Sequence, residues 1–248
     1  MSSKLEEGDF RGAVRLVCSE DSIAPRDDST FEALKQKHPP SYLDTTIPLL
    51  SEDLDSVSIT VSETEIVRAI KSFPNSSAGG PDGLKRRHLK DVIHPSAGGG
   101  SQALLSAMAS FTKLVLEEKT PPSVRVFFFG ANLTALTKKC GGIRPTAVGC
   151  TLRWLVAKVA ANKVRDEMSF LLAPRQLGFG VKGGAEAAVH AARMYVQDLG
   201  TSCGLLKLDF RNAFNTLRRD KMLLAVEDSA PELYAFFHSA YSSSSSLF

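Results

Sequence analysis

The residues of this chain best suited to chemistry lie in the stretch GLLKLDFRNAFNTLRRDKML, from Gly204 to Leu223. Three leucines lead to one acid, Asp209, and an amphipathic pattern follows at once. The leucines predict a buried strand, and the pattern behind them predicts a helix. A carboxylate at such a junction can cap the helix, or it can bind a hard cation such as Mg²⁺, which prefers oxygen ligands. The spacing of these residues leaves both interpretations open.

The charges are unevenly distributed along the chain, although the net charge is only +3. Residues 1–80 contain 8 Lys/Arg and 14 Asp/Glu, a net charge of −6. Residues 119–175 contain 10 Lys/Arg and only two acids, Asp166 and Glu167, a net charge of +8. A basic block inside a folded sequence suggests a surface for nucleic acid or nucleotide. A solvated charged face is the simpler alternative, and charge alone does not decide between the two.

A second pattern with possible chemistry is GFGVKG, in which Gly178, Gly180 and Gly183 match the dinucleotide-binding spacing G-x-G-x-x-G. That site requires a buried strand directly before the glycines, so that pyrophosphate meets the N-terminus of the next helix. The preceding residues, LLAPRQL, contain Pro174 and make a poor central strand. A loop that touches phosphate fits the sequence better than a nucleotide-cofactor site, which stays open as a weaker alternative.

The composition, 43% hydrophobic and 23% charged, is typical of a globular protein. No apolar run approaches the roughly 18 residues that a membrane span needs, and the N-terminus lacks the apolar core of a secretory signal. The four cysteines are scattered without a C-x-x-C pair, which argues against a zinc ribbon or a disulfide framework. We therefore expect an intracellular protein, nuclear or cytoplasmic, that is not secreted and has no membrane partner.

The elements that must position Asp209 follow from periodicity and from turn residues. A capping box, Ser62 with Glu65, predicts the start of one helix, and Pro121 with Pro122 closes another. Glycine turns separate the segments in the middle of the chain. We predict helices at 6–21, 30–38, 62–73, 101–119, 151–172 and 183–200, a strand at 56–61, and extended segments at 124–139 and 143–148.

The stretch LLKLDFRNAFNTL resembles motif A of reverse transcriptases, in the form found in non-LTR (LINE-type) retrotransposons. Other blocks are similar to the same family and follow its order. SFPNSSAGGPDGLKRRHLKD resembles the fingers motif around Gly-Pro-Asp-Gly, and LTALTKKCGGIRPTAVGCTLRWLVAKVAANKV resembles the Lys-x-Gly-Gly-x-Arg-Pro segment with its helix. PRQLGFGVKGGAEAAVHAAR resembles the Gln-x-Gly stretch before motif A, and DSTFEALKQKHP resembles the lead-in segment. The resemblance covers the chain from about residue 12 onwards.

The resemblance implies roles in nucleotide binding and catalysis. Asp209 corresponds to the first metal-binding aspartate, and Phe210 would contribute its backbone carbonyl to the Mg²⁺ site. Phe214 corresponds to the aromatic residue that disfavours a ribose 2′-OH. Arg144 corresponds to the fingers arginine that contacts the incoming triphosphate, and Lys138 would add a phosphate contact from the same hairpin.

The resemblance also implies a fold and a set of partners. Gly80 and Asp82 of one turn, with Gln176 and Gly178 of another, would position an RNA template and a DNA primer for extension by dNTP. The fold class is α/β (α+β), the fingers and partial palm of a right-hand polymerase, helix-rich with short antiparallel strands. The expected parts are a helical lead-in segment at 1–55, a fingers-like region at 56–200, and a partial palm with motif A at 201–248.

The sequence lacks two features of a complete RNA-directed DNA polymerase. After Asp209 we find neither a glycine-rich motif B nor an aromatic-x-Asp-Asp motif, and one carboxylate does not hold two Mg²⁺ ions in the geometry that nucleotidyl transfer needs. We therefore expect an N-terminal fragment that does not extend a primer by itself. The alternative is a non-catalytic nucleic-acid-binding module that uses the basic fingers surface.

Overall fold

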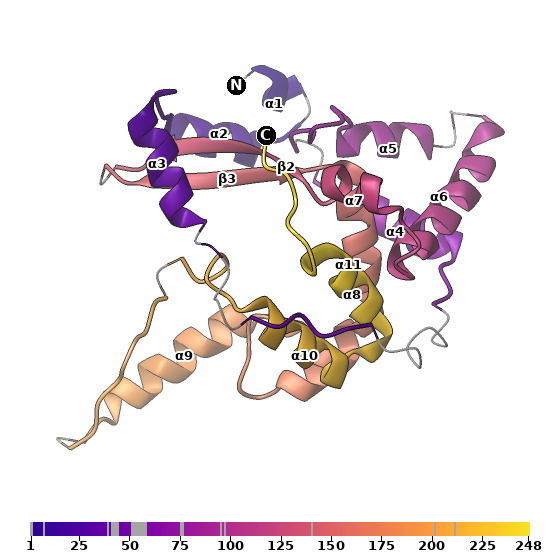
Figure 1. Cartoon of the computed structure of the whole chain (residues 1–248). Helices are drawn as coiled ribbons and strands as arrows, with labels where there is room; N and C mark the ends of the chain where they lie inside the picture. The colour runs from indigo at the N-terminus through magenta and orange to yellow at the C-terminus, as the bar shows by residue number, and fades with distance from the viewer. Residues whose placement is uncertain are drawn as a thin grey trace.

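A computed structural model describes residues 2–6, 8–38, 40, 45–50, 59–74, 77–94, 96, 98–139, 141–200, 202–210 and 212–248. This part of the chain is helix-rich and contains one three-stranded antiparallel sheet, which confirms the mixed helix and strand content predicted from the sequence (Figure 1). The helices are α1 (Ser2–Glu6), α2 (Phe10–Cys18), α3 (Asp28–Lys37), α4 (Glu63–Lys71), α5 (Arg86–Val92), α6 (Gly100–Leu116), α7 (Pro122–Phe128), α8 (Thr151–Leu172), α9 (Gly184–Gln197), α10 (Arg219–Ser229), the 3₁₀ helix η3 (Pro231–Leu233) and α11 (Tyr234–Tyr241). The strands are β1 (Ser22–Ile23), β2 (Ala131–Thr137) and β3 (Ile143–Gly149).

Side-chain caps fix where several helices begin. The Asp9 carboxylate accepts a hydrogen bond from the backbone of α2, and the Asp27 carboxylate accepts one at the start of α3. The capping box of Ser62 and Glu65 is present at α4 as predicted. Each cap pairs a backbone N–H that has no partner within the helix, and such a cap contributes about 1 kcal/mol. These starts depend on residues close together in sequence, which is why the sequence predicts them.

The sheet has the order β1-β2-β3, with both pairs antiparallel. β2 and β3 form a hairpin whose register runs from Ala131 opposite Gly149 to Thr137 opposite Ile143. The extended segment predicted from residue 124 is wrong in its first part, because Pro122–Phe128 form α7. Proline at the first position of a helix is favourable, since its missing N–H would be unpaired there in any case.

The core lies around α8, which is shared by two groups of buried side chains. One group joins α8 to α4, α5 and α6, and the other joins it to α6, α7 and α11. Leu155, Val156 and Val159 are almost completely buried, and Val164 is nearly so. The predicted apolar side of α8 is therefore confirmed. Full burial of a side chain of this size contributes about 1.5–3 kcal/mol, so α8 is central to the packing of α4, α5, α6, α7 and α11.

Two strand predictions do not hold within the described residues. Residues 59–61 have no regular secondary structure, and Ser56 to Ser58 lie outside the described residues. Ile59 is instead buried against the helices around α8. The strand predicted before Asp209 is also absent, because residues 203–210 are exposed and have no regular secondary structure. An apolar run becomes a strand only when another strand pairs with it, and the described residues supply none here.

Within the described residues, no helix is both long enough and apolar enough to cross a lipid bilayer.

Candidate functional site

The cationic residues predicted to contact triphosphate lie at the tip of the β2–β3 hairpin. Lys138 follows β2, and its backbone N–H donates to the carbonyl of Gly142 at 2.8 Å. Arg144 lies opposite Leu136 near the same tip. Gly141 turns the chain with a φ of +78°, a conformation that glycine adopts without steric cost. Local pairing therefore holds Lys138 and Arg144 at one end of a rigid hairpin.

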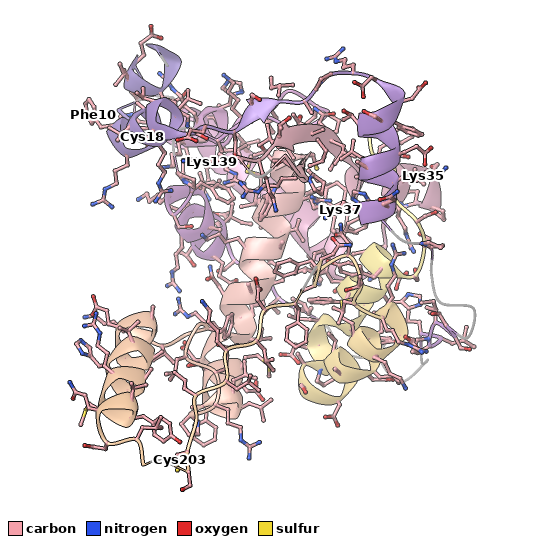
Figure 2. The ribbon with its side chains drawn as sticks, turned by 90° about the vertical axis from the view of Figure 1, so that its left-hand side faces the viewer. Phe10, Cys18, Lys35, Lys37, Lys139 and Cys203 are labelled. Atoms are coloured by element: carbon pink, nitrogen blue, oxygen red, sulfur yellow. The ribbon has the colours of Figure 1, made fainter. Side chains whose placement is uncertain are left out.

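Two acidic residues before β1 neutralise part of this tip. Arg144 Nη1 lies 2.7 Å from the Asp21 carboxylate, and Lys139 Nζ lies 2.5 Å from the Glu20 carboxylate. Figure 2 shows Lys139 beside the end of α2 at Cys18, in agreement with this pairing. Neither acid is predictable from the sequence as part of the site, because Asp21 and Arg144 are 123 residues apart. A phosphate that binds Arg144 must compete with Asp21.

The Gly-Pro-Asp-Gly turn packs against the opposite end of the hairpin. The backbone N–H of Gly83 donates to the carbonyl of Gly80 at 3.0 Å, and the Asp82 carboxylate accepts from the backbone of Leu84 at 3.1 Å. A Cβ added at Gly80 would lie 2.5 Å from the carbonyl carbon of Gly149. Only glycine fits at such an approach, so Gly80 ties this turn to the junction of β3 and α8.

The second predicted template and primer turn lies at the other end of α8. The Gln176 side chain accepts a hydrogen bond from the backbone of Gly178 at 2.7 Å, and both residues follow α8. A helix of 22 residues is about 33 Å long, so the structure does not bring this turn together with Gly80 and Asp82 (Figure 1). Because a helix precedes the glycines of GFGVKG, the strand required for a dinucleotide site is missing.

Asp209 lies in an exposed segment and does not cap a helix. α10 begins only at Arg219, so the capping interpretation of Asp209 is wrong. Phe210 and Phe214 are also exposed, at 75% and 96%. No hydrogen bond or ion pair joins the Asp209 side chain to another residue in the described part of the chain.

The turn after Asp209 is attached to α3. The Asn212 and Asn215 side-chain amides donate to the carbonyl of Lys37 at 2.9 and 2.8 Å. Asn212 has a φ of +58°, in the left-handed region that asparagine tolerates better than most residues. α3 packs on β3, and Figure 2 shows Lys35 and Lys37 on α3 above the chain that rises from Cys203. Asp209 and Arg144 are therefore carried by segments that both contact α3.

The described residues do not complete a Mg²⁺ site. Asp209 and the Phe210 carbonyl would supply oxygen ligands from one segment, whereas no group of three or more His, Cys, Asp or Glu side chains gathers anywhere in the described ranges. Mg²⁺ needs near-octahedral coordination and commonly uses carboxylates together with waters and phosphates. Mg²⁺ therefore stays a prediction from the resemblance.

A cation–π cluster lies beside the Gly-Pro-Asp-Gly turn. The Arg86 guanidinium stacks over the rings of Phe73 and Trp154, 5.1 and 4.9 Å from the ring centres. Trp154 is 42% exposed. Burial lowers the pKa of Arg86 from its ordinary value, but a guanidinium stays protonated in proteins. The cluster thus presents a fixed cation and a partly exposed indole.

The interior holds an ionic cluster that the sequence analysis also missed. The Glu118 carboxylate lies 2.6 Å from Arg125 Nη1 and 3.0 Å from His238 Nδ1. Glu118 has a φ of +56°, which is uncommon for a residue with a side chain. The cluster joins the loop after α6 to α7 and α11, and its role is structural.

No protein family model matches this sequence. The case for a function depends on the residues described above.

Proposed function

We propose that this chain is the fingers region and first part of the palm of a reverse transcriptase of the non-LTR retrotransposon type. The supporting observation is that α3 contacts both β3, which carries Arg144, and the turn after Asp209, through Asn212 and Asn215. Residues that the resemblance assigns to triphosphate and to catalysis thus lie on neighbouring elements although 65 positions separate them in the sequence.

In this proposal the hairpin tip binds the triphosphate of the incoming dNTP. Arg144 offers a planar pair of N–H donors, and such a guanidinium binds phosphate oxygens through two parallel hydrogen bonds. Lys138 adds a point charge from the same tip. Phe214 would lie against the sugar, where a large ring leaves no room for a 2′-OH. Its high exposure leaves this ring open to a ligand.

The experiment is to measure binding of a fluorescent dNTP to the purified chain in buffer with Mg²⁺. Arg144→Ala should weaken binding about tenfold, because one charge-assisted contact contributes about 1.5 kcal/mol. Arg165→Ala is the matched control, since Arg165 on α8 is also a half-exposed arginine in an ion pair, with Asp166. If Arg144→Ala and Arg165→Ala bind equally well, the hairpin is not the triphosphate site.

The second candidate is a non-catalytic nucleic-acid-binding module. The observation in its favour is that strand pairing holds the cationic hairpin, while Asp209 is exposed and, within the described residues, belongs to no group of potential metal ligands. This candidate predicts RNA affinity that falls with added salt and with Lys138→Ala or Arg144→Ala, because phosphate contacts release counterions. It also predicts that Asp209→Asn leaves RNA affinity unchanged and that dNTP does not bind. Salt-independent RNA binding would contradict it.

A further inference from the structure

The segment from Gly204 to Phe210 combines strand-forming residues with full exposure. Each of its residues is exposed; Leu206, Leu208 and Phe210 reach 80%, 70% and 75%. Among the described residues, no backbone hydrogen bond joins this segment to another part of the chain. Figure 1 shows it rising from the end of α9 toward α3 at the outside of the molecule, and Figure 2 places Cys203 at the lower extremity. An apolar segment with unpaired backbone groups is a template for pairing with another strand.

The order of residues in this segment separates charge from apolar side chains. In an extended strand, alternate residues point to opposite faces. Leu206, Leu208 and Phe210 then share one face, whereas Lys207 and Asp209, with opposite charges, share the other face with Leu205. One face is therefore apolar, and the other carries one cation and one anion two positions apart.

This order is complementary to itself in one antiparallel register. When two copies pair with Leu208 opposite Leu208, Lys207 of each copy lies opposite Asp209 of the other, and Leu206 lies opposite Phe210. Directly opposed residues have Cβ atoms about 4.5–5.5 Å apart, so both ion pairs and all the apolar pairs form contacts. The register centred on Lys207 instead places two lysines face to face and Leu205 against Asp209. Charge complementarity thus selects the register centred on Leu208.

We propose that two copies of this chain associate through antiparallel pairing of residues 206–210, centred on Leu208. The partner strand is the same segment of a second copy. When that copy runs antiparallel, its Asp209 and Lys207 lie opposite Lys207 and Asp209 of the first. Two strands of this length bury less area than a standard interface, so the dimer is weak, with a Kd between about 1 µM and 1 mM. The paired state places Asp209 in an ion pair, so dimerisation competes with any ligand of that carboxylate. The inference does not depend on the proposed function.

The test is sedimentation velocity of the full chain over the concentration range of about 1 µM to 1 mM. The wild type should show concentration-dependent dimerisation. Lys207→Asp and Asp209→Lys each convert two attractive pairs into two repulsive ones, so each should weaken the dimer at least about tenfold. The double variant Lys207→Asp/Asp209→Lys exchanges the charges and should restore the dimer. Lys71→Asp on α4 is the matched control, an exposed lysine with the same substitution, and should behave as the wild type.

Disulfide crosslinking tests the same register in a second way. Unlike sedimentation, it does not respond to changes in solubility caused by the charge substitutions. Leu208→Cys, with the exposed Cys18 and Cys203 replaced by serine, should form a disulfide-linked dimer under mild oxidation, because the two Leu208 positions face each other. Leu224→Cys, a half-exposed position on α10, is the control and should crosslink far less.

Three results would overturn the proposal. The first is a wild type that stays monomeric up to about 1 mM, and the second is single variants that dimerise as the wild type does. The third is a double variant that remains monomeric, which would show that pairing of Lys207 with Asp209 does not hold two copies together. Thermal unfolding that matches the wild type checks that each variant is folded, as expected for exposed positions.

Discussion

The ion pair between Asp21 and Arg144 leads to a prediction about ligand affinity. Arg144 Nη1 and the Asp21 carboxylate lie 2.7 Å apart, with the arginine side chain 53% exposed and the acid 24% exposed. A phosphate that contacts Arg144 must displace this carboxylate. Asp21→Asn removes the competing charge, so the variant should bind RNA and nucleoside triphosphate more tightly than the wild type does.

The size of the effect follows from the exposure of the pair. Ion pairs in contact with solvent contribute about 0.2–1 kcal/mol. Removal of the Asp21 carboxylate should therefore lower the Kd for a phosphate ligand at Arg144 about 1.4- to 5-fold. The gain should shrink as salt is added, since screening weakens the pair and the phosphate contact alike. Glu20→Gln should give a smaller gain, because Lys139 and Glu20 are both more than 60% exposed.

The assay is fluorescence anisotropy of a short labelled RNA, repeated with a fluorescent triphosphate. Asp166→Asn is the control for net charge, because it removes one acid from a 93% exposed position on α8. Its affinity should stay close to that of the wild type. If Asp21→Asn binds no more tightly than Asp166→Asn, phosphate does not bind at Arg144 and the reasoning is refuted.

Three further predictions concern stability. Leu155→Ala should lower the free energy of unfolding, measured by urea denaturation, by about 2–5 kcal/mol. Phe170→Ala is the control on the same helix, at an 87% exposed position, and should change the free energy of unfolding by less than about 0.5 kcal/mol. Glu118→Ala should cost about 2–4 kcal/mol in the same assay, because it leaves the largely buried Arg125 without a carboxylate to balance its charge; a loss below about 0.5 kcal/mol would contradict this. The hydrogen bonds from Arg218 lower the pKa of Asp220 from 3.8 to about 2. The ionised carboxylate therefore stabilises the fold above pH 3.8, and this stabilisation is lost as the pH falls from 3.8 to about 2. Asp220→Asn should therefore be less stable than the wild type near neutral pH and equally stable below about pH 2, and a difference in urea midpoint that does not change with pH would contradict this.

The sequence predicted the elements that short-range signals determine. The capping box of Ser62 and Glu65 links positions three apart, and the apolar side of α8 repeats over a few turns. The hairpin follows from β-favouring residues around a glycine turn. In each case the residues that decide the structure lie within one element, so a single sequence contains the necessary information.

The predictions that failed depend on contacts between distant residues. The leucines before Asp209 have the pattern of a buried strand, but a strand also needs a partner to pair with. The pairing of Asp21 with Arg144 spans 123 residues, and nothing near either residue indicates it. The stacking of Arg86 from α5 on Trp154 from α8 likewise joins residues that are 68 positions apart. Such contacts form only when segments that are distant in the sequence pack together.

The most direct test of the proposed polymerase site is photocrosslinking of a radiolabelled azido-dNTP to the chain, followed by mapping of the labelled peptides. The proposal predicts adducts in the β2–β3 hairpin and in the segment around Asp209 and Phe214, with labelling lost in Arg144→Ala and competed by unlabelled dNTP. Labelling confined to the glycine loop at 178–183, or labelling that unlabelled dNTP does not reduce, would contradict it.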